Sequence, residues 1–271
     1  MITASARSEL LESASRVWRA YRYWTHIYKR TWRASLASGF LTPALFMAAM
    51  GLGLGTLVNR HGSSAHQLGG VSYLAFIAPG LLAASAMQMA AIEGMFPVMA
   101  GIKWIKFYQA MLASPITVTE VLYAHLLWMA TRVAMVSAIF LGAMFAFGAP
   151  RSAEVLAAVP VAVLTGMSMA VPSAAFTATR ESDQALIGVI RFVVMPMFLF
   201  SGTFFPLSQL PAWIRPLAYI TPLWHGVALC RSLSLGNASL GASLGHVAYL
   251  LAVIGAATLV ARRTFTRRLA A

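Results

Sequence analysis

Residues 201–231 decide the fold of this chain, and they read SGTFFPLSQLPAWIRPLAYITPLWHGVALCR. The segment is apolar and aromatic, yet prolines interrupt it at positions 206, 211, 216 and 222. A proline inside a helix removes a backbone hydrogen bond and costs about 3 kcal/mol, so one straight membrane-spanning helix is excluded. The segment is also too hydrophobic for a solvated loop. It predicts two short helices that enter the bilayer and return, shielded by neighbouring helices.

The composition of the chain is that of a polytopic membrane protein. Of its 271 residues 59% are hydrophobic and 10% are charged, whereas a soluble domain carries about 25% charged residues. The net charge of +13 would suggest nucleic acid in a soluble protein. Here the basic residues lie in short segments between apolar runs, so we predict no nucleic-acid partner. The single cysteine, Cys230, excludes an intrachain disulfide and a cysteine-based metal site.

The apolar runs predict an all-α protein with six transmembrane helices. At about 1.5 Å per residue, each run can cross a hydrocarbon core of about 30 Å. The predicted spans are residues 36–58, 72–96, 120–148, 153–178, 184–205 and 241–261. They form one membrane domain, residues 36–262, between an N-terminal segment (1–35), too charged and aromatic for a cleavable signal peptide, and a basic tail (263–271).

The distribution of Lys and Arg predicts the orientation. Residues 1–35 and 262–271 and the connections 97–119 and 180–183 together hold fourteen basic residues, whereas the other three connections hold four. Cytoplasmic segments carry the excess of Lys and Arg. Both termini are therefore expected in the cytoplasm, and residues 201–231 in the outer half of the membrane.

An amphipathic helix is expected before the first span. Five aromatic residues recur every three or four positions and fall on one helical face, opposite a basic face: Trp18, Tyr21, Trp24, Tyr28 and Trp32. This pattern is typical of a helix in the membrane interface, with its rings among the acyl chains. The alternative is a solvated basic tail.

Three charged residues lie within predicted spans: Glu93, Arg132 and Arg191. Ionisable groups inside a bilayer are costly and usually face a partner or a wet path. Glu93 could pair with either Arg132 or Arg191. The alternative is that each group extends to the interface separately.

Residues 97–119 contain a second amphipathic segment. Apolar positions at Ile102, Ile105 and Tyr108 or Gln109 alternate with Lys103 and Lys106, and Trp104 and Phe107 add aromatic bulk. A short surface helix without catalytic groups can dock another protein. The alternative is a loop that merely lies at the interface.

An enzymatic function is not supported. The only lysines are Lys29, Lys103 and Lys106, and none lies in a Walker motif. The metalloprotease motif HExxH is also missing from the sequence. Glu93 with His125, or His225 near Cys230, are isolated groups within apolar runs that we interpret as packing residues. We therefore predict neither a catalytic nor a metal site.

Three stretches of the chain resemble the permease subunits of ABC-2 type ATP-binding-cassette exporters. They are GLGLG at 51–55 with YLAFIAPG at 73–80, FYQAMLASP at 107–115, and SGTFFP at 201–206 followed by Leu210-Pro211 and PLWH at 222–225. Within the family, the first stretch and the context of Glu93 look most like nodulation-factor (lipo-oligosaccharide) exporter permeases, with daunorubicin-type drug-export permeases as relatives.

The resemblance implies a type V exporter fold, with a cytoplasmic coupling helix at about 100–113 and an outer re-entrant hairpin at about 206–231. Its implied partners are a cytosolic ATPase subunit, which binds ATP and Mg, and a second permease copy, identical or similar. The chain would export an amphiphilic substrate, either lipid-linked, a glycolipid or lipo-oligosaccharide, or drug-like, across the bacterial cytoplasmic membrane, and would bind no cofactor itself. Lys103, Trp104, Lys106 and Phe107 would couple to the ATPase. The exit gate would comprise Phe204, Phe205, Pro206, Pro211, Pro222 and His225.

The competing interpretation is a secondary transporter or channel that needs no ATPase. It predicts inverted repeats and ion-coupling acids near the middle of the membrane. The sequence has no convincing repeat, and Glu93 is the only acid well inside a predicted span.

Overall fold

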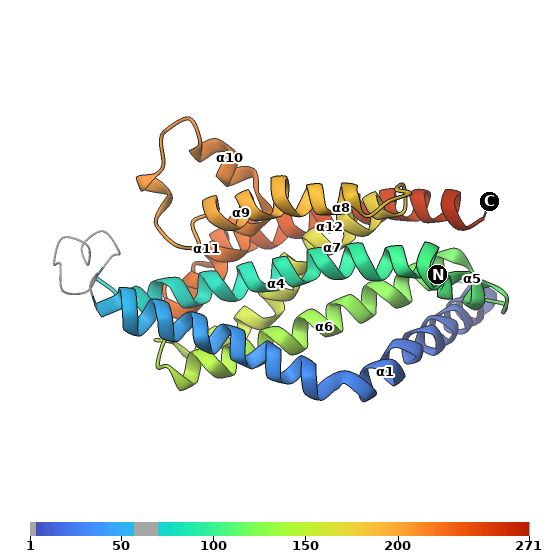
Figure 1. Cartoon of the computed structure of the whole chain (residues 1–271), viewed down its shortest axis with the longest axis horizontal. Helices are drawn as coiled ribbons and strands as arrows, with labels where there is room; N and C mark the ends of the chain where they lie inside the picture. The colour runs from blue at the N-terminus through green and yellow to red at the C-terminus, as the bar shows by residue number, and fades with distance from the viewer. Residues whose placement is uncertain (1–3, 57–69, 271) are drawn as a thin grey trace.

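The structure is a computed structural model that describes residues 4–56 and 70–270. Within these residues every regular element is a helix, and the helices run roughly along one long axis (Figure 1). We call one end of the bundle the α5 end, after helix α5, Phe107–Leu112; it contains residues 100–117, 178–183 and 262–270. The opposite end is the α10 end, after helix α10, Arg215–Ile220; it contains residues 147–152, 201–221 and 236–239.

The N-terminal helix is longer than the sequence suggests. Helix α1, Ala4–Met47, continues directly into the π-helical turn η1, Ala48–Leu54, and bends partway along its length (Figure 1). The predicted interface helix and most of the first span therefore belong to one continuous helix. Residues 57 and 58 of that span lie outside the described residues.

Four helices of the described chain are long and apolar enough to cross a membrane. The first is α4, Tyr73–Met99, which continues as the π-helical turn η2, Ala100–Trp104. The second is α6, Val118–Ala146, and the third joins η3, Ala153–Ala157, to α7, Ala158–Thr177. The fourth is α12, Leu240–Leu269. They match the predicted spans 72–96, 120–148, 153–178 and 241–261.

Two of these helices extend past their predicted ends. The second span was expected to end at about residue 96, but α4 continues through Pro97 to Met99. Membrane helices tolerate proline where neighbouring groups satisfy the freed carbonyl. Helix α12 continues through Arg262 and Arg263 to Leu269 because long basic side chains can leave the helix surface without interrupting its backbone hydrogen bonds.

The predicted fifth span is shorter than expected. Helix α8, Gln184–Val189, the π-helical turn η4, Ile190–Val194, and helix α9, Met195–Phe200, form one apolar rod. The rod stops at Phe200 rather than at residue 205, because the chain turns at Gly202, whose φ of +79° is readily adopted only by glycine.

The proline-rich segment contains the two expected short helices. They are α10, Arg215–Ile220, and α11, Pro222–Leu235, preceded by the 3₁₀ turn η5, Leu207–Gln209. Pro216 and Pro222 lie in the first turns of α10 and α11, where no intrahelical donor is lost. The Thr221 side chain caps α11 by accepting from the backbone N–H of Trp224.

Helix α4 is the central helix of the bundle. Of its most apolar window 78% is buried, against 11% for α12, which lies at the periphery. Small residues bring the helices close: a Cβ on Gly94 would lie 2.4 Å from the carbonyl oxygen of Ala170 in α7. Likewise, a Cβ on Gly226 of α11 would lie 2.1 Å from Oγ1 of Thr165. Such contacts are how membrane helices gain packing energy.

Candidate functional site

The connection from α4 to α6 consists of two helical pieces. Instead of one helix over about 100–113, η2 extends α4 to Trp104 and a separate helix α5, Phe107–Leu112, follows. The break is at Lys106, whose φ of 60° is left-handed, a conformation uncommon for residues other than glycine. Lys103 and Trp104 therefore belong to the end of α4, and Phe107 begins α5.

The two rings at the start of α5 contact three long helices. The phenol of Tyr108 is buried and hydrogen-bonds with Nδ1 of His125 on α6, while its ring lies 5.8 Å from that of Phe265 on α12. The Phe107 ring packs 6.0 Å from Trp24 of α1, and Trp24 stacks on His125 at 4.7 Å. We call these five side chains the aromatic hub. Any movement of α5 must displace them.

The hub is pressed against the backbone of Gly101. A Cβ there would lie 2.5 Å from the Tyr108 ring and 2.7 Å from the Phe107 ring, so no larger residue fits without displacing both. Burial raises the pKa of the Tyr108 phenol well above its ordinary value. The phenol is therefore protonated at neutral pH and available as a hydrogen-bond donor.

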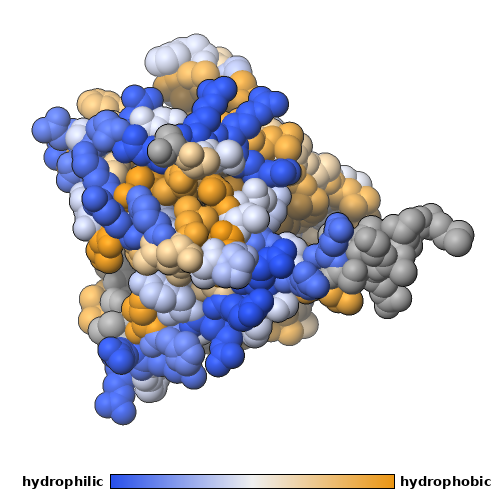
Figure 2. Space-filling view, turned by 90° about the vertical axis from the view of Figure 1, so that its right-hand side faces the viewer, coloured by the Kyte–Doolittle hydropathy of each residue, from blue (hydrophilic) through white to orange (hydrophobic). Residues whose placement is uncertain are grey.

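The remaining predicted coupling residues point outward at the α5 end. The Trp104 side chain is 53% exposed, and Lys103, Ile105 and Lys106 are exposed as well. Figure 2 views this end and shows hydrophilic residues around an apolar centre. Tryptophan is enriched in protein–protein interfaces, so the exposed Trp104 beside the buried hub makes this end suitable for contact with another protein.

Glu181 joins three elements at the same end. In the turn between α7 and α8, its carboxylate accepts a hydrogen bond from Arg268 of α12 and lies 3.5 Å from Nζ of Lys103 on η2. The hydrogen bond from Arg268 holds the pKa of Glu181 below its ordinary value. The end of α12 is thereby tied to the end of α4–η2.

A second ion pair ties α1 to α6. Nε of Arg16 donates to Oε1 of Glu120 at 2.8 Å. Glu120 also closes a capping box with Thr117, whose backbone N–H donates to Oε2 at 2.9 Å. One carboxylate thus both starts α6 and anchors α1.

The aromatic face of α1 packs mainly on α6, not on lipid as expected. The hydroxyl of Tyr21 donates to Oγ1 of Thr131 at 3.2 Å, and the rings of Tyr28 and Trp128 are 5.5 Å apart. Tyr21, Trp24 and Tyr28 of α1 face the bundle because α6 presents a polar or aromatic partner opposite each of them. Trp18 and Trp32 are exposed and remain available to a membrane interface.

The three charged residues of the predicted spans separate into a pair and a single group. Nε and Nη2 of Arg132 lie 3.2 and 3.1 Å from Oε1 of Glu93, and both side chains are largely buried. The Arg132 guanidinium also lies 4.8 Å from the centre of the Tyr28 ring. Arg191 is exposed on η4. Of the two partners predicted for Glu93, the structure selects Arg132.

At the α10 end, Arg231 of α11 holds the turn that follows α9. Its Nη2 donates to the carbonyl of Gly202 at 2.8 Å, and its Nε to the carbonyl of Phe76 on α4 at 3.1 Å. The guanidinium lies 3.8 Å from the centre of the Phe76 ring. Phe204 in the same turn packs 5.1 Å from Phe198 of α9.

The residues predicted for the exit gate form separate groups. His225 faces α12, where its Nδ1 lies 2.8 Å from Nδ1 of His246 and its ring stacks 3.9 Å from Tyr249. Phe205 joins a small apolar cluster with Leu207 and Leu210. Pro206 and Pro211 flank η5, and Pro222 starts α11. These residues surround α10 and α11 without converging on one point.

Several of these residues are not evident from sequence. The Tyr108–His125 bond and the His225–His246 contact join elements whose packing no spacing rule predicts. The capping box Thr117-x-x-Glu120 is a readable signature, and it marks the start of α6. In the described part of the chain, no three His, Cys, Asp or Glu side chains gather where they could hold a metal ion.

Comparison with known proteins identifies the family to which this chain belongs. The chain is 32% identical over 222 residues to Nodulation protein J of Rhizobium leguminosarum bv. trifolii, which covers 82% of this chain and 80% of the relative. It is 31% identical to Nodulation protein J of R. leguminosarum bv. viciae over 255 residues, 93% of either chain. A 58-residue stretch, 21% of this chain and 16% of the relative, is 38% identical to the probable multidrug ABC transporter permease YbhR of Escherichia coli (strain K12). Residues 22–235 match the family described as ABC-2 type transporter. The chain is therefore a member of the ABC-2 type transporter family, a multi-pass membrane protein that serves as a transporter subunit rather than as a catalytic enzyme.

Proposed function

We propose that this chain is the permease subunit of an ATP-driven exporter in the bacterial cytoplasmic membrane. A separate cytosolic subunit binds ATP and Mg, hydrolyses the nucleotide and drives the permease. The substrate is an amphiphile, either a lipid-linked molecule, glycolipid or lipo-oligosaccharide, or a hydrophobic drug-like compound. Family membership and the relatives named Nodulation protein J support this proposal.

The observation that carries the proposal is the aromatic hub. An ATPase docked on Lys103, Trp104 and Lys106 moves α5, because these residues flank the break at which α5 begins. Phe107 and Tyr108 pass this movement to α1, α6 and α12 through their ring contacts and the bond to His125. Interlocked cores respond to such a push by switching between discrete packings rather than by deforming smoothly.

The proposed topology has six spans and places the α5 end in the cytoplasm. The apolar part of α1 with η1 is the first span, and the rod Gln184–Phe200 is the fifth. Both termini are then cytoplasmic, in line with the fourteen Lys and Arg residues on that side. Helices α10 and α11 form the re-entrant hairpin in the outer half, near which the substrate leaves.

A second permease copy, identical or similar, completes the path. Phe192 on η4 is 81% exposed, and Met195, Leu199 and Phe200 beside it are also exposed. Leu41 and Leu45 on α1 add further exposed apolar side chains. Such surfaces fit both lipid and the apolar face of another permease.

Co-purification with the ATPase tests the proposal. The triple variant Lys103→Ala/Trp104→Ala/Lys106→Ala should fold, lose the ATPase subunit and lose ATP-dependent transport. Glu181→Gln is the matched control, because it breaks the Lys103 ion pair and leaves the outward side chains in place. Transport that persists without any ATPase would instead support a secondary transporter or channel.

The Glu93–Arg132 pair argues against that alternative, since an ion-coupling acid must be open to its ion.

Substrate class can be tested in cells. Deletion of the gene should cause a labelled glycolipid to accumulate in the inner leaflet if the substrate is a lipo-oligosaccharide. If the substrate is drug-like, deletion should lower resistance to hydrophobic compounds and leave glycolipid distribution unchanged.

A further inference from the structure

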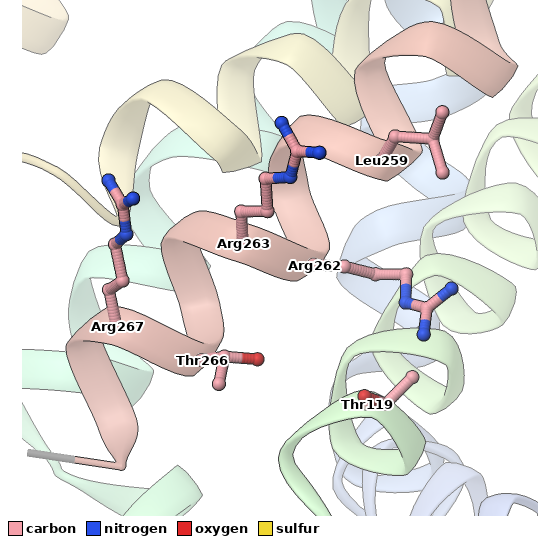
Figure 3. A pocket seen from close by; sticks show the side chains of 6 residues that line it. All are labelled: Thr119, Leu259, Arg262, Arg263, Thr266 and Arg267. Carbon is pink, nitrogen blue, oxygen red and sulfur yellow. The ribbon is translucent and has the colours of Figure 1, made fainter.

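A basic cavity lies on the flank of the bundle beside the last turns of α12. It has a volume of about 500 Å³ and faces the start of α6. Its lining residues are Thr119, Leu259, Arg262, Arg263, Thr266 and Arg267. Figure 3 shows Arg262 extending toward Thr119 on α6, whereas the side chains of Arg263 and Arg267 project together from another face of α12, away from α6. Three arginines and two threonines thus line the groove, and the Arg262 guanidinium is the one directed across it toward α6.

The charge of this groove is not neutralised by the protein. The adjacent Arg268 is bound to Glu181. No ion pair joins Arg262, Arg263 or Arg267 to an acid within residues 4–56 and 70–270. Arginine presents several donors in a planar fork that matches the oxygens of a phosphate. The groove is therefore complementary to an anion with several oxygens.

The surface next to the arginines is apolar and uncovered. Leu259, one turn before Arg263, is 61% exposed, and Leu251 and Val260 on the same helix are also exposed. This apolar surface of α12 ends where the arginines begin. A membrane helix makes that transition at the boundary between acyl chains and headgroups. A ligand that fills the groove and covers Leu259 must carry both a phosphate and an apolar chain.

We infer that the groove between α12 and α6 binds the phosphate of an anionic phospholipid, with an acyl chain lying along Leu259 and Leu251. Basic pockets between membrane helices bind such headgroups on the cytoplasmic side. The exposed leucines favour a lipid over a soluble phosphate. Only the assignment to the cytoplasmic leaflet depends on the orientation proposed above, because binding itself requires neither an ATPase nor transport.

Lipid binding in detergent micelles tests this inference, since a micelle of neutral detergent has no charged bilayer surface that attracts basic proteins generally. Short-chain phosphatidylglycerol is titrated into the purified full-length chain, and bound lipid is counted by native mass spectrometry. Each arginine near an anionic lipid is expected to raise the binding affinity about fivefold. The triple variant Arg262→Gln/Arg263→Gln/Arg267→Gln should therefore bind phosphatidylglycerol about a hundredfold more weakly. The matched control, Arg19→Gln/Arg22→Gln/Arg30→Gln, removes equal charge from exposed positions of α1 and should retain wild-type affinity.

Two further arms separate the possible ligands. Phosphatidylcholine and glycerol phosphate should each compete poorly, because the first lacks net charge and the second lacks the acyl chain. The inference is wrong if the triple variant binds phosphatidylglycerol as wild type does, or if glycerol phosphate binds as tightly as the lipid.

Discussion

Glu93 and Arg132 form an ion pair between α4 and α6 in the apolar part of the bundle. Removing one member of a buried pair leaves an uncompensated charge and costs about 3–5 kcal/mol in proteins studied in water. In the hydrocarbon region the same reasoning holds, because the orphaned charge cannot gain water. The sequence predicts the charges and their depth, but the choice of Arg132 over Arg191 depends on helix packing.

We therefore expect Glu93→Gln and Arg132→Met each to lower the melting temperature of the purified protein strongly. The double variant should be more stable than either single variant, because it leaves no unpaired charge. Arg191→Met is the control and should change stability by no more than about 0.5 kcal/mol, since Arg191 is exposed. Additive losses in the double variant would show that the pair is not coupled.

Tyr108 offers a second test at the residue scale. Tyr108→Phe keeps the ring packing of the aromatic hub and removes only the bond to His125, so a buried nitrogen loses its partner at a cost of about 1–3 kcal/mol. We expect lower stability and, under the proposed function, less substrate moved per ATP hydrolysed. Tyr123→Phe on the exposed face of α6 makes the same chemical change and should have no effect on either measurement. Equal behaviour of the two variants would remove Tyr108 from the transmission path.

At the scale of elements, helix contacts depend on single small residues. Gly226→Ala would place a methyl group 2.1 Å from Oγ1 of the buried Thr165, so α11 must move away from α7. Overpacking of this kind costs about 1–3 kcal/mol. Gly245→Ala in α12 is the matched control, because its Cβ would meet nothing within 4 Å and alanine favours the helix. Thermal unfolding should show a loss for the first variant and no loss for the second.

The ion pairs at the α5 end predict a pH dependence. The folded-state pKa of Glu181 lies below its unfolded value because of the bond from Arg268. Its contribution to stability is therefore present above the unfolded pKa of about 4.3 and is lost as the pH falls through the lower, folded value. The protection factor of amides at the end of α12, which compares their exchange rate with that of an unfolded peptide at the same pH, should fall on acidification through that value. In the Glu181→Gln protein the protection factor should be low at every pH; a pH response that survives this substitution would contradict the assignment.

Sequence patterns predict the elements better than their contacts. Proline spacing and hydrophobic runs identify α10, α11 and the four long helices, because backbone hydrogen bonding and burial in lipid constrain those features locally. The ends of α4 and α12 lie beyond the predicted ends of their spans, because a helix can continue through proline or arginine when neighbouring groups support it. The aromatic face of α1 was expected to contact lipid, but it packs on Trp128 and His125, which lie about a hundred residues away along the chain. A buried tryptophan such as Trp24 and a lipid-facing tryptophan fit the same periodicity, so the sequence pattern cannot distinguish them.

For the whole molecule, the proposed orientation gives opposite labelling at the two ends. Cys230 is buried and unpaired, so a Cys230→Ala background allows single cysteines to be placed at will. Ala113→Cys at the α5 end should react with an impermeant thiol reagent only in inverted vesicles, and Asn237→Cys at the α10 end only in intact cells. Both positions are exposed. The reverse labelling pattern would show that the orientation is opposite to the one proposed. Reaction of both cysteines from the same side would show that both ends of the bundle lie on that side.

The π-helical turns η1, η2 and η4 lie within or at the ends of three helical segments: α1, α4 and the α8–α9 rod. A π turn holds one residue more than an α turn of the same helix. When such a turn relaxes to α-helix, the surplus residue passes to the next turn and every side chain beyond it rotates by about 100°. Segments of α1, α4 and the α8–α9 rod can thus swivel about their own axes while nearly all of their backbone hydrogen bonds stay closed. A shift of a π turn along a helix therefore changes which side chains face the neighbouring helices. The helix does not have to unfold for this change.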